Sequence, residues 1–180
     1  MIEFKPIFLD NGVTQIHPLR QMDMERHDDL VNDLFEIYSD KETTRFIPEK
    51  RVSNQKEIVD RLFGVTIGYH RKESFTHFIT LKEFNKTIGQ IDIHSPIRIE
   101  QHYDVKGTWF IEYALNRQLW GHGVMSGAVG AVIQKLKTQG IIKIAAACMP
   151  DNLGSICILE KVGFIRTRKF DTKQDLYELK

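Results

Sequence analysis

The stretch that decides the fold runs from Tyr113 to Gly127 and reads YALNRQLWGHGVMSG. It begins in an alternating segment over 108–115 that is typical of a strand, passes through two glycines and continues with helical spacing. Glycines let the backbone approach a ligand closely, and a helix N-terminus carries partial positive charge. The stretch therefore predicts a strand, a loop and a helix whose start binds an anion such as a phosphate or pyrophosphate.

Upstream of this stretch, two helical patterns precede a pair of strands. Apolar spacing predicts one helix over 22–38 and a second that begins after an N-cap at Ser53. Alternation over 75–81 and 87–94, around a turn at 85–86, predicts an antiparallel hairpin of half-buried strands.

Downstream, one β-α-β unit and a terminal hairpin complete the chain. The predicted elements are a helix that Gly140 ends, a buried strand over 141–148, a short helix capped by Asp151 or Asn152, and a hairpin of 164–170 with 175–179. The order of these patterns predicts an α+β fold.

Composition narrows the class of protein. The 180 residues suit a single domain over 1–180, and the formal net charge of +1 supplies no overall field toward nucleic acid or a membrane. No apolar run is long enough to span a bilayer or to act as a signal peptide, so we expect a soluble cytoplasmic protein. Cys148 and Cys157 form no C-x-x-C pair, so we expect two reduced, half-buried thiols and no metal site.

Two other phosphate-binding loops are less favoured. A P-loop needs Lys and Ser or Thr after its last glycine, but Ala128 and Val129 follow Gly127. A dinucleotide fingerprint needs its first glycine at the strand end, whereas 116–120 intervene here, and it needs further parallel β-α units. The dinucleotide-binding interpretation is kept as a minor alternative.

The motif Gln118-x-x-Gly121-x-Gly123 resembles the acyl-CoA loop of the GNAT superfamily of N-acetyltransferases. Asn152-x-x-Ser155 and the run LEKVGF over 159–164 are similar to the branch that includes the ribosomal-protein N-terminal acetyltransferases. The resemblance implies a mostly antiparallel central sheet with helices on both faces and splayed central strands that form an acyl-CoA slot.

The resemblance also implies an enzyme that moves an acetyl group from acetyl-CoA directly to a primary amine, on a protein N-terminus or a small molecule. A non-catalytic acyl-CoA-binding or sensing module is the alternative, and the oligomeric state is monomer or homodimer. The residues implied in cofactor binding are Tyr113, Ala114, Leu115, Gln118, Leu119, Trp120, Gly121, His122, Gly123, Val124, Met125, Ser126, Asn152 and Ser155.

The catalytic candidates are Glu112 as base and Ser155 as the group that assists the leaving thiolate. Ser155 is the remaining candidate acid because Leu159 stands where many relatives carry a tyrosine; otherwise the thiolate leaves into water. His77, Asp92 and His94, on the predicted hairpin, are alternatives that could line the acceptor pocket.

Overall fold

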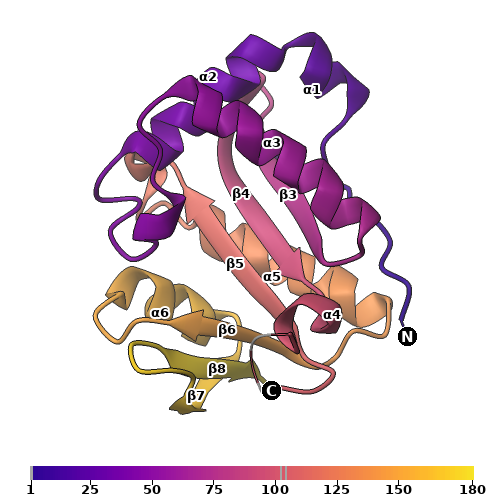
Figure 1. The fold of residues 1–180 in the computed structure, drawn as a ribbon, viewed down its shortest axis with the longest axis vertical. Helices are drawn as coiled ribbons and strands as arrows, with labels where there is room; N and C mark the ends of the chain where they lie inside the picture. The colour runs from indigo at the N-terminus through magenta and orange to yellow at the C-terminus, as the bar shows by residue number, and fades with distance from the viewer. Residues whose placement is uncertain (1, 102, 104) are drawn as a thin grey trace.

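An eight-stranded sheet forms the centre of the computed structural model, which describes residues 2–101, 103 and 105–180 (Figure 1). The strand order is β1-β2-β3-β4-β5-β6-β8-β7. The strands are β1 (Leu9–Asp10), β2 (Thr14–His17), β3 (Ser74–Leu81), β4 (Lys86–His94), β5 (Trp109–Leu115), β6 (Ile144–Cys148), β7 (Phe164–Lys169) and β8 (Asp175–Leu179). The helices are α1 (Gln21–Glu25), α2 (His27–Ser39), η1 (Pro48–Lys50), α3 (Gln55–His70), α4 (Pro96–Ile99), η2 (Arg117–Leu119), α5 (Val124–Thr138) and α6 (Leu153–Lys161).

Only β5 and β6 are paired in parallel; the other strand pairs in the described chain are antiparallel. The parallel pair follows from its connection, because α5 carries the chain from the end of β5 back to the start of β6. The predicted α+β class, mostly antiparallel with one β-α-β unit, is confirmed.

Helices cover both faces of the sheet (Figure 1). On one face, Leu34 of α2 and Ile58 of α3 pack in one cluster with Phe78 of β3. On the other, Val132 of α5 packs with Ile91 of β4. The prediction of half-buried hairpin strands is therefore wrong for both strands, because β3 is buried on both faces from 75 to 80 and β4 from 87 to 93.

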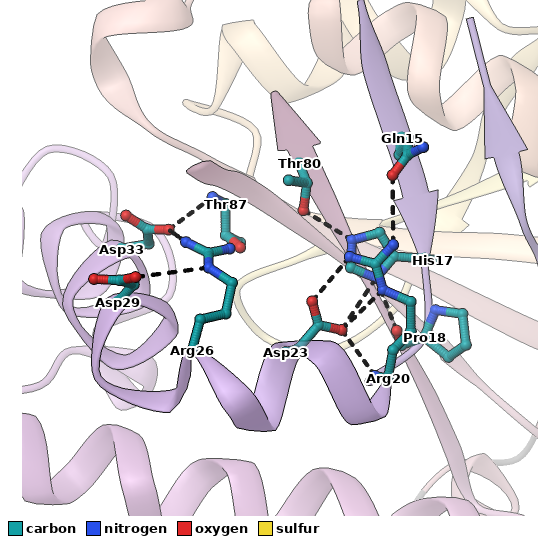
Figure 2. A network of polar contacts seen from close by, with 10 residues as sticks. All are labelled: Gln15, His17, Pro18, Arg20, Asp23, Arg26, Asp29, Asp33, Thr80 and Thr87. Atoms are coloured by element: carbon teal, nitrogen blue, oxygen red, sulfur yellow. Dashed lines mark hydrogen bonds and ion pairs between the residues drawn. The ribbon is translucent and has the colours of Figure 1, made fainter. Parts of the chain in front are cut away.

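The predicted helix over 22–38 is broken at Arg26, which has φ −110° and ψ 37° and separates α1 from α2. No glycine or proline marks the break. The Arg26 guanidinium instead reaches Asp33 at 3.2 Å and Asp29 at 3.8 Å, and Asp33 also accepts the backbone N–H of Thr87 on β4 (Figure 2). The break is thus held by contacts that join the helix to the sheet.

The start of α3 is also one residue later than predicted. Its N-cap is Asn54, whose side chain accepts the N–H of Glu57, whereas the Ser53 N–H donates to the Glu57 carboxylate. By contrast, the predicted cap at Asn152 and the predicted stop at Gly140, with φ +80°, are confirmed.

A second network of polar contacts in Figure 2 joins α1 to β2, because the Asp23 carboxylate lies 3.6 Å from Nδ1 of His17. Asp23 accepts hydrogen bonds from the side chain and backbone of Arg20, and the His17 ring bonds Thr80 on β3 at 2.8 Å. Burial raises the pKa of Asp23, but the hydrogen bonds from Arg20 outweigh it, so the net pKa is lowered and the carboxylate stays charged.

No helix in the described ranges is long and apolar enough to cross a membrane. Both cysteines are free thiols, but the expectation that each is half-buried is wrong, because Cys148 is buried and Cys157 is exposed.

Candidate active site

The two central strands separate soon after they meet. β5 pairs with β6 only at Trp109–Ile144 and Phe110–Ala145, while β5 continues along β4 to Leu115 and β6 continues along β8 to Cys148. The remainder of the two strands diverges (Figure 1). Residues from both strands line a cavity of about 220 Å³. The splayed strands expected from the resemblance are confirmed.

The loop after β5 presents an array of free backbone donors. Gly121 and Gly123 have φ of +78° and +77°, a region that costs little only for glycine. Gly123 is the N-cap of α5 and supplies no side-chain cap, and the first bond of that helix runs from the Gly127 N–H to the Gly123 carbonyl. Within the described chain, none of the N–H groups from Gly121 to Ser126 donates a hydrogen bond.

This array fits a pyrophosphate, because consecutive N–H groups and a helix N-terminus both favour an anion. The N–H groups of 118–120 are used within the loop, with the carbonyl or side-chain oxygen of Asn116 and the carbonyl of Arg117 as acceptors. The free array therefore begins at Gly121 rather than at Gln118. Trp120 holds the loop against the strand, since its indole N–H donates to the Leu115 carbonyl at 2.9 Å.

The far wall of the slot carries polar groups from α6. The Asn152 side-chain oxygen accepts the Ser155 N–H at 3.2 Å, and its amide nitrogen has no partner among the described residues. Both residues line the cavity. The free side-chain amide nitrogen of Asn152 is a hydrogen-bond donor in a position that fits the amide-bearing arm of coenzyme A.

Sequence reasoning missed the side chain of Tyr113. Its hydroxyl lies 2.8 Å from Ser155 Oγ and donates to the Ser155 carbonyl at 3.2 Å. Burial raises the pKa of Tyr113, so the hydroxyl keeps its proton. The alternation of β5 was the available signal, because it places Tyr113 on the opposite face from Glu112.

On that opposite face, Glu112 belongs to a charged cluster. Its carboxylate is 2.8 Å from the Lys50 ammonium and 3.2 Å from Nε2 of His94. Lys50 also pairs with Asp92 at 3.2 Å, and His94 Nδ1 lies 3.0 Å from the Ser74 hydroxyl. Lys50 comes from η1 between α2 and α3, and no sequence motif pointed to it.

Glu112, Asp92 and Lys50 are all charged in this cluster. Burial raises the pKa of Glu112, but Lys50 and the hydrogen bond from His94 outweigh this and lower it to about 2. Burial likewise opposes ionisation of Asp92, yet the nearby Lys50 leaves its pKa well below the usual range. Attraction to both carboxylates outweighs burial and raises the pKa of Lys50. Glu112 is therefore ionised at neutral pH but binds a proton weakly.

The three predicted alternatives on the hairpin have different positions. His94 lines the cavity. Asp92, contrary to the prediction, is not among the described lining residues; it lies opposite Glu112 in the pairing of β4 with β5, where it accepts from Thr76 and Gln90 and pairs with Lys50. The prediction for His77 is wrong: it is buried in the core, where Nε2 accepts the Ile7 N–H at 3.0 Å and Nδ1 contacts the Phe75 carbonyl at 3.1 Å.

Comparisons with known proteins agree with this geometry. The protein-family model described as the acetyltransferase (GNAT) domain matches residues 19–165, and the chain belongs to this family. It is accordingly an acetyl-CoA-dependent acyltransferase. A search of curated protein sequences finds no match.

Solved structures share the fold over nearly the whole chain. A GNAT-family acetyltransferase from Bacillus anthracis has a TM-score of 0.67 at 20% identity, with 96% of each chain covered. The ribosomal-protein-S5-alanine acetyltransferase from Vibrio fischeri has a TM-score of 0.66 at 19% identity, covering 96% of this chain and 94% of that one. RimL, a ribosomal L7/L12 α-N-protein acetyltransferase solved with coenzyme A, has a TM-score of 0.69 at 17% identity, covering 96% and 97%.

Proposed function

We propose that this protein is an N-acetyltransferase, a single domain over 1–180, that moves an acetyl group from acetyl-CoA directly to a primary amine. The amine is a protein N-terminal α-amine or belongs to a small molecule. The observation that carries the proposal is the array of free N–H groups from Gly121 to Ser126 beside a slot that has Glu112 on one face and Ser155 on the other. The ribosomal-protein acetyltransferases among the structural neighbours support an amine acceptor.

We assign the binding of acetyl-CoA to three parts of the slot. The N–H groups from Gly121 to Ser126 hold the pyrophosphate, and 118–120 shape the loop that presents them. The edge of β5 over 113–115, which β6 leaves unpaired, bonds the pantetheine amides in the manner of an added strand. Asn152 donates to the same arm through its free amide nitrogen.

Acetyl-CoA supplies the acyl group as a thioester. The acceptor amine must lose a proton, and Glu112, which is ionised at neutral pH, is the candidate base within the cavity. The hydrogen bond from His94, whose Nδ1 lies 3.0 Å from the Ser74 hydroxyl, holds the Glu112 carboxylate in place at the slot. On the other face, Ser155 and the Tyr113 hydroxyl are the candidate donors to the departing thiolate.

The low proton affinity of Glu112 favours an acceptor that needs little help to become neutral. At pH 7.5 the neutral form costs about 4 kcal/mol for a lysine side chain but under about 1 kcal/mol for an α-amine. A weak base therefore suits an α-amine, or a small amine of similar pKa, better than a lysine side chain.

The first test is thermal unfolding with acetyl-CoA, with NADH and ATP as controls. A ligand that binds only the native state at about 100 times its Kd stabilises it by roughly 2.7 kcal/mol, which is several degrees for a domain of this size. We expect a shift with acetyl-CoA alone, followed by thiol release when a panel of amines is added. A shift without thiol release from any amine would indicate the non-catalytic module, and a shift only with NADH or ATP would overturn the proposal.

A further inference from the structure

The acceptor side of the cavity has an aromatic wall. The Phe170 ring lies 5.3 Å from the Phe110 ring and 4.3 Å from the Tyr103 ring, measured between centroids. Ile99 and Phe46 extend this apolar lining. The wall joins segments that are distant in the sequence, including β5, the connection between β7 and β8, and the loop between α2 and α3.

This wall lies on the same side of the sheet as Glu112. Phe110 and Glu112 are separated by one residue on β5, so their side chains share a face. Phe110 is also opposite His94 in the pairing of β4 with β5, and His94 contacts the Glu112 carboxylate. An amine next to Glu112 therefore has the aromatic wall beside the group that carries it.

Acidic side chains line the cavity without Arg or Lys beside them in its described lining. The carboxylates that line it belong to Glu49 and Glu112, and no Arg or Lys is among its described lining residues. Lys50, behind Glu112, has its ammonium paired with Glu112 and Asp92. A carboxylate or phosphate attached near the acceptor amine would find no cationic partner and would face Glu112.

The cavity also limits the size of the acceptor. Its volume of about 220 Å³ is shared with the end of the acetyl-CoA arm, since Asn152 and Ser155 line the same cavity, and it is below the roughly 300 to 1,000 Å³ of pockets that enclose drug-sized ligands. It therefore has room for the amine and the group directly attached to it, and the rest of a larger acceptor must lie outside.

We propose that the preferred acceptor is a primary amine whose carbon carries an uncharged apolar group, aromatic by preference, and no carboxylate. Two sources offer this chemistry with an α-amine: a small amide of an aromatic amino acid, and an N-terminal residue with a large apolar side chain, whose carboxyl is part of a peptide bond. The inference rests on the proposed function and names its substrate class. Free amino acids and polyamines are expected to be poor acceptors.

The test compares kcat/KM for matched amines with acetyl-CoA in excess. Phenylalaninamide and phenylalanine differ in the free carboxylate, so phenylalanine should be at least about tenfold worse when the two are compared at equal concentrations of neutral amine, because its charge is desolvated without a partner. Phenylalaninamide and a peptide that begins with Phe distinguish the two sources. A peptide that begins with Ser and the polyamine spermidine test the need for an apolar group.

A pair of variants tests whether the aromatic wall causes the preference for an apolar acceptor. Phe170→Ala should raise KM for phenylalaninamide by about tenfold, as expected for loss of a buried aromatic contact, with KM for acetyl-CoA unchanged. Phe84→Ala, at an exposed phenylalanine on the turn between β3 and β4, should change neither. Phe170→Leu replaces Phe170→Ala if the alanine variant does not fold. Calorimetric binding of phenylalaninamide to the protein with coenzyme A gives a readout without turnover.

Equal kcat/KM for phenylalanine and phenylalaninamide, or a preference for spermidine or the Ser peptide, would overturn this inference while thiol release upheld the acetyltransferase itself. No thiol release from any amine would count against the proposed function instead.

Discussion

At the scale of single residues, the site depends on two pairs of side chains on opposite faces of β5. Lys50 and Glu112 hold fixed charges on one face, and Tyr113 and Ser155 share a hydrogen bond on the other. The alternation of a strand keeps the two pairs apart although Glu112 and Tyr113 are adjacent in the sequence. Proton removal and proton delivery can therefore occur on separate sides of the slot.

Glu112→Gln should lower kcat/KM most for acceptors that are hardest to deprotonate. The change removes the ionised carboxylate and keeps the size of the side chain, and loss of a general base typically costs about 10² to 10⁴-fold in rate. We expect a larger loss for a lysine-like amine than for an α-amine, measured as thiol release at pH 7.5. An equal loss for both amines would show that Glu112 only positions the acceptor.

Tyr113→Phe should lower kcat by about tenfold or more while leaving the affinity for acetyl-CoA unchanged, because it removes a hydroxyl that the structure bonds to Ser155. Ser155→Ala should have a similar effect. If the two hydroxyls act as one unit, the double variant should lose less than the product of the single losses. Independent, multiplying losses in the double-mutant cycle would contradict this arrangement.

At the scale of elements, the loop between β5 and α5 is the part whose backbone conformation matters most. The proposed binding of a pyrophosphate requires backbone N–H donors rather than particular side chains, and Gly121 and Gly123 have positive φ angles within that donor array. The space around each glycine is open, since a Cβ there would meet nothing within 4 Å. Any effect of a substitution must therefore come from the backbone.

Gly123→Ala should weaken acetyl-CoA binding and destabilise the protein by roughly 1 to 2 kcal/mol, the cost of a left-handed conformation for an L-residue. Gly130→Ala is the matched control within α5, where a Cβ makes an ordinary 3.7 Å contact with Val162. It should stabilise by roughly 0.5 to 1 kcal/mol and leave binding unchanged. Binding is measured by calorimetry and stability by urea unfolding; equal binding by both variants would argue against the N–H array.

At the scale of the whole molecule, the N-terminal segment packs against the core beside His77, a buried and neutral histidine. His77 Nε2 accepts the Ile7 N–H, so Nδ1 carries the proton and donates to the Phe75 carbonyl. Phe4 stacks on Phe75 with centroids 4.0 Å apart. A protonated ring could not accept from Ile7, and the buried site would have to hold a charge.

Stability should therefore fall below neutral pH. Burial lowers the pKa of His77 from 6.5 to about 4. Between these two pH values the unfolded chain binds a proton at His77 and the folded chain does not. The contribution of His77 to the free energy of unfolding is therefore complete above about pH 6.5 and is lost as the pH falls toward 4. The loss is up to about 3 kcal/mol.

His77→Gln should be less stable at pH 7 but should show a flatter dependence of the unfolding free energy on pH between 6.5 and 4.5. His70→Gln, at an exposed histidine in the last turn of α3, should keep the slope of the parent protein. Urea titrations at several pH values measure both. An unchanged slope in His77→Gln would assign the acid sensitivity to other groups.

The sequence alone determined the fold class, the β-α-β unit and the glycine loop before α5. These follow from signals that are local in the chain: strand and helix periodicity, the glycines at 121, 123 and 140, and the cap at Asn152. Such signals act through backbone conformation within a few residues, so they can be recognised without knowledge of distant contacts.

Only the tertiary structure decided which side chains meet. The break at Arg26, the pairing of Lys50 with Glu112, and the hydroxyl pair of Tyr113 and Ser155 each join elements that are far apart in the sequence. The aromatic wall around Phe170 has the same origin. Periodicity tells which face of an element a residue occupies, but the neighbour across that face is set by how the elements pack on the sheet.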